Sequence, residues 1–329
     1  MSIRLFILVL ISCVLLVGCA NNTSDILAKN DDFLIIRTDV GDSFASLAEQ
    51  YLGDARYASV IQRYNPGMSA NSSSQIAIPL KNMNRSGVHA NGYQKVPVLC
   101  YHQFTSKEKG KSKMVVSAAE FEAQMTFLYE NDYQVIPLID LKPFLAGQKE
   151  LPQKSVVITI DDGYKSYLDV ALPILKKYDF HSTMFVYPEF VGAGPALKWR
   201  DVKMLSEHPL VSIQSHSKTH DSLSRRPSGD ETDADYQKRI KLEVEGAEEI
   251  LLRRTGNSVE HFAYPYGNSS AQLVTLLKQN DYSMALTVNA ASNPAFASPF
   301  LLHRTMIYGG DSLGIFKKSL DTFNSVVLK

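Results

Sequence analysis

The chain has 329 residues, of which 45% are hydrophobic and 21% charged, with 18 Gly and 14 Pro. This composition is that of an ordinary globular protein, so collagen-like and intrinsically disordered chains are excluded. The 34 Lys and Arg residues balance 34 Asp and Glu residues, and we therefore expect no nucleic-acid partner. At this length we expect one large domain accompanied by a small one.

The first 18 residues are typical of a secretory signal peptide. Arg4 supplies a positive start, residues 5–17 are almost all apolar, and a Gly precedes Cys19. The apolar run is too short for a comfortable membrane span. Residues 16–19 resemble a bacterial lipobox, which implies that Cys19 carries a lipid and begins the mature chain. The alternative is a plain signal peptide or an uncleaved anchor.

Either interpretation exports the protein. With lipid on Cys19 we expect a cell-envelope protein anchored to a membrane, namely the outer membrane, facing the periplasm or the surface, if the organism is Gram-negative. Cys100 is the only other cysteine of the mature chain, so no intramolecular disulfide can form in the lipidated protein. Cys100 lies in the apolar run of residues 96–101 and is expected to be a buried small hydrophobe without a chemical role.

Residues 33–80 are expected to form a small independent module. The polar residues 19–32 before it are expected to be a tether, and from Phe33 the pattern predicts strand, helix, helix and strand. The module resembles the LysM domain, and the motifs that carry the resemblance are Gly41-Asp42-Ser43-Phe44, Tyr51-Leu52-Gly53-Asp54, Asn65-Pro66 and Ile76-Ala77-Ile78-Pro79. That family binds N-acetylglucosamine-containing glycans, so the resemblance implies binding to peptidoglycan or a similar polymer. A spacer that binds nothing is the alternative.

Residues 81–95 have no apolar periodicity and are expected to form a flexible linker. A second domain, residues 96–329, follows, in which strand-like and helical runs alternate as far as residue 287. This alternation predicts an α/β fold with parallel strands and crossover helices. About seven strands fit a distorted (β/α) barrel, closed or nearly closed, whose catalytic residues lie at the carboxyl ends of the strands.

Polar motifs follow two of these strands. The strand at residues 156–160 ends in the adjacent acids Asp161 and Asp162, and the strand at residues 212–215 precedes His216 and His220. A spacing of four residues on a helical turn would bring both imidazoles to one side. Two histidines and one carboxylate leave coordination positions open for water and substrate, as in a catalytic metal site. A helix N-cap for the acids and a solvated loop for the histidines are the structural alternatives.

These motifs resemble those of the NodB-homology polysaccharide deacetylases, over residues 96–307. Members of that family use a metal ion to remove N-acetyl groups from amino-sugar polymers. The resemblance implies that Asp161 is the general base and that Asp162, His216 and His220 hold a divalent metal ion. We expect zinc, with nickel, cobalt or iron as alternatives.

Residues 262–267 resemble the third motif of the family, in which a backbone N–H binds the oxyanion. In this sequence that N–H would be the one of Tyr266. The Arg that usually orients the base from this motif is missing, because Ala263 stands near its place. Our hypothesis is that Arg304 reaches the same acid from another strand.

Residues 97–102 and 262–267 look like those of the poly-N-acetylglucosamine deacetylases that act on biofilm exopolysaccharide. In that branch the histidine at the end of the first strand, here His102, is the general acid. His303 is the competitor, and a structural role for His102 is the further alternative. Trp199, the only Trp, could stack on a sugar ring or pack a helix.

We therefore predict metal-dependent hydrolysis of N-acetyl groups from a polysaccharide that contains N-acetylglucosamine, with biofilm exopolysaccharide as the favoured substrate. Two alternatives remain. The substrate could be the N-acetylglucosamine of peptidoglycan, or the protein could be a non-catalytic LysM-type lipoprotein that binds the wall.

Overall fold

The structure is a computed structural model that describes residues 25–30, 33–71, 73–80, 84–89, 91–108, 110–225 and 230–326. The predicted signal peptide and Cys19 lie outside these ranges. Within the ranges, no helix combines the length and the apolar character that crossing a membrane requires.

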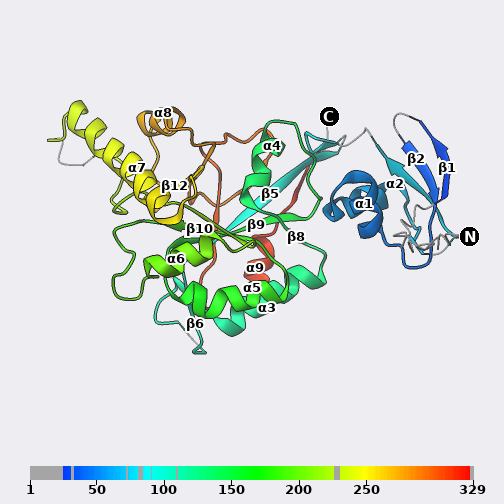
Figure 1. Ribbon diagram of the computed structural model, residues 1–329, viewed down its shortest axis with the longest axis horizontal. Helices are drawn as coiled ribbons and strands as arrows, with labels where there is room; N and C mark the ends of the chain where they lie inside the picture. Colours follow the sequence, from blue (N-terminus) through cyan, green and yellow to red (C-terminus); the bar gives the residue numbers. More distant parts are fainter. Residues whose placement is uncertain are drawn as a thin grey trace, which may run out of the picture.

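The amino-terminal part is a small antiparallel sheet with two helices beside it (Figure 1). Its predicted order of strand, helix, helix and strand is present, preceded by one further strand. Its elements are β1 (Asp25–Lys29), β2 (Phe33–Arg37), α1 (Phe44–Leu52), η1 (Ala55–Tyr57), α2 (Ala58–Tyr64) and β3 (Gln75–Pro79), with the strands in the order β1-β2-β3.

Strand β1 corrects the prediction of a tether over residues 19–32. Its five residues pair antiparallel with β2, from Asp25 opposite Arg37 to Lys29 opposite Leu34. All five are exposed, so the strand is held by backbone pairing rather than by burial of side chains. A strand without a buried face leaves no alternating pattern in the sequence, which is why the prediction was wrong here.

Local signals explain where the helices of this part begin and end. Ser43 caps α1 through a reciprocal capping box with Ser46, and Gly53 ends the helix at a φ of 78°. Asn65 ends α2, and its side-chain amide donates hydrogen bonds to the carbonyls of Ile61 and Ala77. The amide oxygen of Asn65 accepts the N–H of Ala77, so one side chain ties the helix to β3.

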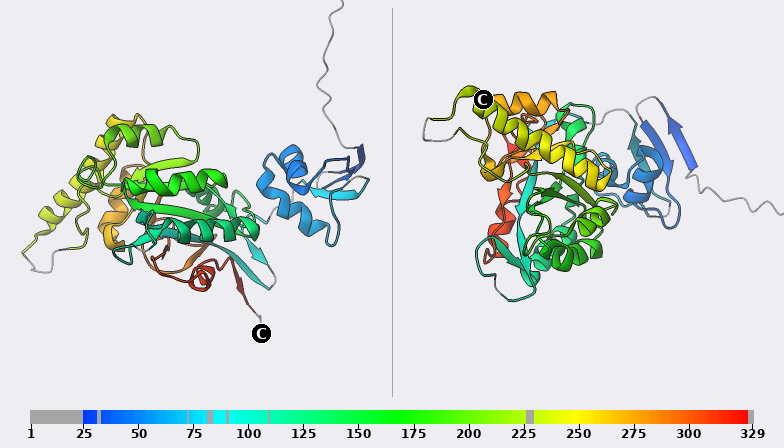
Figure 2. Two further views of the ribbon diagram at one scale, coloured as in Figure 1. Left: turned by 90° about the horizontal axis from the view of Figure 1, so that it is seen from below. Right: turned by 60° about the vertical axis from the view of Figure 1, so that its left-hand side comes forward.

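Two ion pairs join this amino-terminal part to the rest of the chain. Arg56 pairs with Asp140, and Arg63 pairs with Glu150. The Glu150 side chain is only 2% exposed, so the second pair is largely shielded from water on its acidic side. The two parts lie side by side in both views of Figure 2, in agreement with these contacts.

The predicted linker at residues 81–95 is partly ordered. Strand β4 (Val88–His89) pairs with β5 (Gly92–Tyr101), so β5 begins four residues before the domain start expected at residue 96. Strand β16 (Phe323–Ser325) pairs with the same end of β5. Gly92 permits this approach, because a Cβ there would lie 2.0 Å from the carbonyl oxygen of Asn324.

The larger part is built on one mixed sheet whose main path runs β13-β12-β11-β10-β9-β5-β14. Every neighbouring pair from β13 to β5 is parallel, whereas β14 is antiparallel to β5. The remaining strands of the path are β9 (Ser155–Asp162), β10 (Ser182–Val186), β11 (Val211–Ser215), β12 (His261–Ala263), β13 (Met284–Leu286) and β14 (Ser292–Pro294). Two short strands pair outside the path, β8 (Gln134–Val135) with β9 and β15 (Thr305–Met306) with β5.

This sheet curls into a half-barrel instead of the closed or nearly closed barrel that we expected. Across the open side there is one isolated bridge, between Leu286 and Leu302, and the two-residue strand β15. The segment between the bridge residues contains Pro294 and Pro299. Prolines lack the N–H that a continuous ladder needs, which fits the short pairing of this stretch: only Ser292–Pro294 forms a strand in it, and that strand pairs antiparallel with β5.

Most of the helices cover the outer face of the sheet, while a second apolar cluster, which includes Leu141 and Phe144 of a short helix, fills its inner face. Along β9, Val156, Ile158 and Ile160 belong to the outer cluster and Val157 to the inner one. Asp161 continues the inner register, so it points into the half-barrel. The helices are α3 (Ala118–Glu130), α4 (Leu141–Leu145), α5 (Leu172–Lys177), α6 (Trp199–Ser206), α7 (Asp233–Thr255), α8 (Ala271–Gln279) and α9 (Leu313–Lys318), with short turns η2 (Leu138–Asp140), η3 (Tyr167–Ala171) and η4 (Pro265–Gly267).

Candidate active site

A cavity of about 460 Å³ opens at the carboxyl ends of the parallel strands. Two more short strands, β6 (Gln103–Thr105) and β7 (Val115–Ser117), form a pair at its edge. Acids, imidazoles and tyrosines dominate the wall, which includes His102, Asp161, Asp162, Tyr164, His216, His220, Tyr264, Tyr266 and Tyr308. The cavity therefore contains six of the seven residues to which the sequence assigned a favoured catalytic or metal-binding role, and the seventh, Arg304, binds Asp161 from behind it.

Asp161 is held by Arg304 in a bidentate ion pair. The two guanidinium nitrogens donate to the two carboxylate oxygens over 2.7 and 2.8 Å, and both side chains are almost completely buried. Arg304 also donates through Nε to the carbonyl of Thr287. Burial alone would raise the pKa of Asp161, but the charge and hydrogen bonds of Arg304, together with smaller contributions from His216 and His102, outweigh burial and hold that pKa well below its ordinary value. The acid is thus kept ionised.

Asp162 turns away from the strand and lacks such a partner. Its backbone has a φ of 77°, the left-handed region, and Gly163 follows at 85°. Its Oδ1 atom is buried without a hydrogen-bond partner and lies 3.7 Å from Nε2 of His216 and 3.5 Å from Nε2 of His220. Burial, together with the charge of Asp161, raises the pKa of Asp162 to about 7.

His216 directly follows β11 and is fixed by the neighbouring strand. Its Nδ1 lies 2.8 Å from the carbonyl oxygen of Ala263, which can only accept, so Nδ1 carries the hydrogen. The lone pair of Nε2 then faces the carboxylate of Asp162. Burial lowers the pKa of His216 to about 3, and the ring therefore stays neutral, as a metal ligand must be.

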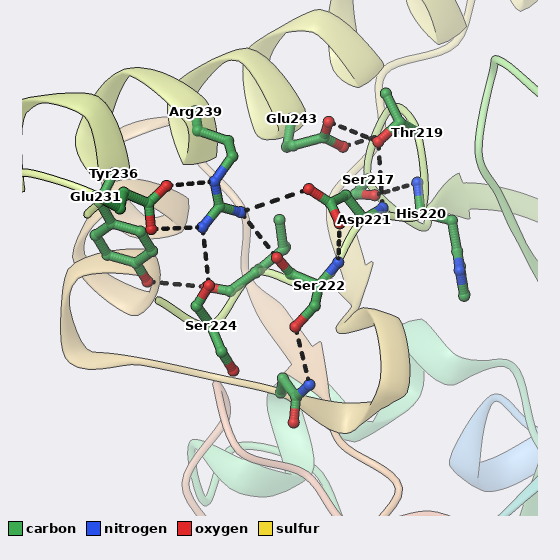
Figure 3. Close-up of polar contacts among 12 residues, drawn as sticks. Ser217, Thr219, His220, Asp221, Ser222, Ser224, Glu231, Tyr236, Arg239 and Glu243 are labelled. Atoms are coloured by element: carbon green, nitrogen blue, oxygen red, sulfur yellow. Dashed lines mark hydrogen bonds and ion pairs between the residues drawn. The ribbon is translucent and has the colours of Figure 1, made fainter. Parts of the chain in front are cut away.

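The segment from His216 to His220 is an irregular loop, so our prediction of a helical turn was wrong. Ser217 and His220 both have a φ of 63°, and the Ser217 hydroxyl accepts the backbone N–H of His220 (Figure 3). The two imidazole rings nevertheless lie close together, with centroids 4.7 Å apart. Left-handed turns, rather than the pitch of a helix, bring the rings to one side of the cavity.

The donor set fits a divalent cation. One ligand atom from each of Asp162, His216 and His220 lies within 4.8 Å of the others. The set combines an orphaned carboxylate oxygen with two imidazoles whose pKa values are lowered by burial. A cation among these atoms would satisfy the buried oxygen and favour the ionised carboxylate. Three protein ligands beside an open cavity leave positions for water and substrate.

Tyr266 lies beside the second histidine. Its backbone is left-handed, with a φ of 58°, and its ring centroid lies 4.8 Å from that of His220. Gly267 permits the close approach of this turn to the segment that follows β13, because a Cβ there would lie 2.6 Å from the Val288 side chain. The Tyr266 side chain is 63% exposed at the mouth of the cavity, and the oxyanion role of its N–H stays a prediction.

The two candidate general acids have different positions. His102 follows β5, lines the cavity, and has a ring nitrogen within 4.8 Å of an Asp161 oxygen. Burial lowers its pKa, whereas Asp161 opposes that shift. His303 is absent from the described residues that line the cavity, and its Nδ1 is buried without a partner. Trp199 begins α6, where the guanidinium of Arg254 lies over its ring.

Our sequence reasoning missed two contacts of the site. The Cys100 thiol donates to Oδ2 of Asp161 over 3.5 Å, and burial raises its pKa so that it keeps its proton. The signal was its spacing, since Cys100 shares the inner register of Val98 and precedes His102 by two residues. Glu243 on α7 binds the backbone of the histidine loop. The signal for Glu243 in the sequence was an acidic residue on the buried face of a long helix.

Comparison with known proteins agrees with this geometry. Residues 148–285 match the family model described as polysaccharide deacetylase. Over 222 residues the chain is 27% identical to YxkH of Bacillus subtilis, which bears a polysaccharide deacetylase name; the match covers 68% of this chain and 75% of that protein. Over 259 residues it is 25% identical to poly-beta-1,6-N-acetyl-D-glucosamine N-deacetylase of Escherichia coli, covering 68% of this chain but only 38% of that longer protein.

The fold is shared with solved structures. Superposition on IcaB from Ammonifex degensii gives a TM-score of 0.61 at 24% identity and covers 70% of this chain and 98% of the other. The residues matched by the family model, 148–285, include Asp161, Asp162, His216, His220 and Tyr266. The chain therefore contains a NodB-homology polysaccharide deacetylase domain, a type of domain found in hydrolases that remove N-acetyl groups from polysaccharides.

Proposed function

We propose that this protein is a metal-dependent deacetylase of a polysaccharide that contains N-acetylglucosamine. One observation carries the proposal. An orphaned carboxylate and two neutral imidazoles converge in the cavity beside a second acid, which Arg304 keeps ionised. This arrangement combines a cation site with a free base, the two elements that hydrolysis of an amide requires.

Asp162, His216 and His220 are the residues that would hold the ion, for which we expect zinc. When bound, a divalent cation supplies Lewis acidity, which lowers the pKa of water towards about 7 and polarises an acetyl carbonyl. Asp161 is paired with Arg304 at 2.7 Å, closer than the 3.7 Å between its Oδ2 and Nε2 of His216, and one of its oxygens would accept the proton of an attacking water. The bidentate pair keeps that carboxylate in a fixed orientation.

Two further residues complete the proposed reaction. The backbone N–H of Tyr266 donates to the oxyanion of the tetrahedral intermediate, and one such donor is worth about 3–4 kcal/mol. His102 then gives a proton to the departing amine, so the C–N bond breaks to leave acetate and a free amino sugar. His102 is favoured over His303 because its ring lies in the cavity, close to Asp161.

A poly-N-acetylglucosamine exopolysaccharide is the favoured substrate. The support is the similarity to proteins named poly-beta-1,6-N-acetyl-D-glucosamine N-deacetylase in Escherichia coli and Staphylococcus aureus. Peptidoglycan is the second candidate, and it is supported by the LysM-like motifs of residues 33–80. In that case the amino-terminal module would bind the wall glycan while the cavity deacetylates it.

We also propose that the protein is exported and anchored to a membrane of the cell envelope through lipid on Cys19. The support is the sequence of residues 1–19 alone. Lipid labelling of the full-length protein in a bacterial host tests this proposal. Cys19→Ser is expected to abolish incorporation of labelled fatty acid and to release the protein from the membrane fraction, and continued labelling would contradict it.

Acetate release from purified poly-N-acetylglucosamine, peptidoglycan sacculi and chitin oligomers tests the activity and ranks the substrates. We expect the fastest release from poly-N-acetylglucosamine, loss of release after treatment with a chelator, and recovery on addition of zinc. Faster release from sacculi would favour peptidoglycan. If the metal-loaded protein released acetate from none of the three, the non-catalytic alternative would replace our proposal.

A further inference from the structure

Helix α7 lies behind the loop that carries His220, and we propose that Glu243 of this helix is a positioning residue for that histidine. Its carboxylate binds the backbone between the two imidazole ligands and thereby fixes the turn that directs His220 towards Asp162. The inference rests on the proposed function, because it assigns Glu243 a role only if His216 and His220 hold a cation.

The contacts of Glu243 are local to the loop (Figure 3). One carboxylate oxygen accepts the backbone N–H groups of Lys218 and Thr219 over 3.0 and 2.9 Å, and the other accepts the Thr219 hydroxyl over 2.8 Å. Glu243 is only 4% exposed. Hydrogen bonds to a buried charged acceptor are stronger than those between neutral groups, so this clamp is a strong one.

The loop needs such a clamp because it has no secondary structure of its own. Ser217 and His220 adopt left-handed conformations, which cost free energy in residues other than glycine. Lys218 and Thr219 lie between them, and Glu243 takes up both of their N–H groups. Without the carboxylate, two backbone donors would lose their partner, and the strained turn would be free to relax.

Packing also presses the loop onto α7. Gly246 lies one turn after Glu243, and a Cβ at this position would come within 3.0 Å of the Lys218 side chain. The Lys218 side chain extends over this glycine and its ammonium group pairs with Glu189 over 3.3 Å. The stretch of chain between the two ligands is therefore in direct contact with the helix.

The same helix fixes the chain on the other side of His220. Arg239 donates to the carbonyls of Ser222 and Ser224, each over 2.8 Å, while it also pairs with Glu231. One turn earlier, the Tyr236 hydroxyl donates to the carbonyl of Leu223. Figure 3 shows these contacts as one continuous network along α7. His220 thus lies between two anchored segments, and Glu243 is the anchor on the side of His216.

Binding of Co²⁺ to the full-length chelator-treated protein tests the inference, since its visible absorption reports the geometry of the ligands. We expect Glu243→Ala to weaken Co²⁺ affinity about 10- to 100-fold and to alter the absorption bands, as loss of a group that orients a ligand does. Glu243→Gln keeps one carbonyl oxygen for the two N–H groups and should stay within about threefold of the parental affinity. Glu245→Ala, on the same helix, is the matched control and should change neither readout.

The outcomes separate this inference from the proposed function. If the parental protein bound no Co²⁺, the cation site itself would be refuted and the role of Glu243 with it. If the parental protein bound Co²⁺ and Glu243→Ala bound it with unchanged affinity and spectrum, only the positioning role would be overturned. Circular dichroism checks that each variant is folded. If Glu243→Ala does not fold, Glu243→Asp takes its place in the test. Because the Asp side chain is shorter, this variant should bind Co²⁺ more weakly than the parental protein does. An unchanged Co²⁺ affinity would refute the inference.

Discussion

Asp161 and Asp162 are neighbours in the sequence and line the same cavity, but the structure holds them in different ways. Asp161 continues the register of β9 and receives two hydrogen bonds from the buried Arg304. Asp162 leaves the strand in a left-handed conformation, and its buried Oδ1 has no partner. The pKa of the first is lowered, while that of the second is raised to about 7.

This difference shows that the chain by itself compensates the charge of Asp161 but not that of Asp162. A buried carboxylate is stable when a fixed cationic group compensates its charge, and Arg304 does this for Asp161. Near Asp162 the closest groups are two imidazoles that burial keeps neutral. In the proposed function its compensation comes from a bound cation. The base half, Asp161 with Arg304, is thus built in advance, whereas the proposed ligand half, Asp162 with His216 and His220, would be completed by the cation.

Changes in the ligand half should have the largest effect. We expect His216→Ala and Asp162→Ala to abolish cation binding and to lower acetate release by about four orders of magnitude, since Lewis-acid stabilisation is worth several kcal/mol and each 1.36 kcal/mol is tenfold. Metal content after gel filtration, measured together with acetate release, checks this. Full activity of either variant without bound metal would refute the assignment of Asp162 and His216 as cation ligands.

A change of Asp161 should have the opposite pattern, with metal retained and turnover lost. Asp161→Asn is expected to keep the cation and lose turnover by about 10³-fold, because general-base catalysis contributes roughly 10²- to 10⁴-fold. Metal content and kcat measured on the same preparation separate the two effects. The assignment of the base would be refuted by an active, metal-loaded Asp161→Asn protein.

The general acid should show a smaller effect. His102→Gln is expected to lower kcat about 10²-fold with little change in metal content, because proton donation to the departing amine is lost. The matched variant His303→Gln should remain within a few-fold of the parental kcat, since its ring lies outside the cavity. The reverse ranking of the two variants would make His303 the acid.

The smallest effect at neutral pH should come from Arg304→Gln. Arg304 lowers the pKa of Asp161, so the base stays ionised as the pH falls. In Arg304→Gln, burial raises the pKa of Asp161, so on acidification the base takes up a proton and activity falls at a higher pH than in the parental protein. The acidic limb of the kcat/KM profile should therefore move upward, with about a two- to tenfold loss at pH 7.

The free energy of unfolding of Arg304→Gln should also be lower than that of the parental protein. The paired carboxylate stabilises the fold above its unfolded pKa, and this contribution is lost as the pH falls through the lower folded value. Removing Arg304 should cost about 3–5 kcal/mol of unfolding free energy at neutral pH, because a buried charge loses its partner. Urea denaturation at several pH values measures this. An unchanged acidic limb and an unchanged unfolding midpoint would show that Arg304 has no role towards the base.

Sequence patterns predicted the regular elements well and the irregular ones poorly. The strand expected at residues 156–160 is observed as Ser155–Asp162. It is buried at every position, so it appears in the sequence as an almost unbroken apolar run that ends in two acids. Strand β1 buries nothing, and the curl of the sheet depends on pairing between distant segments, so neither left such a signal.

By itself, the sequence singled out the residues that we propose carry the chemistry, because acids and histidines at the ends of buried strands have few structural uses. Only the tertiary structure decided how each one serves. Among the described residues, eight non-glycine positions have a left-handed backbone, and four of them, Asp162, Ser217, His220 and Tyr266, lie in the site. Such conformations persist only where surrounding contacts impose them. The contacts that hold the site come from residues distant in the chain, which meet the motifs only after folding: Arg304 binds Asp161, Ala263 binds His216, and Glu243 binds the loop between Ser217 and His220.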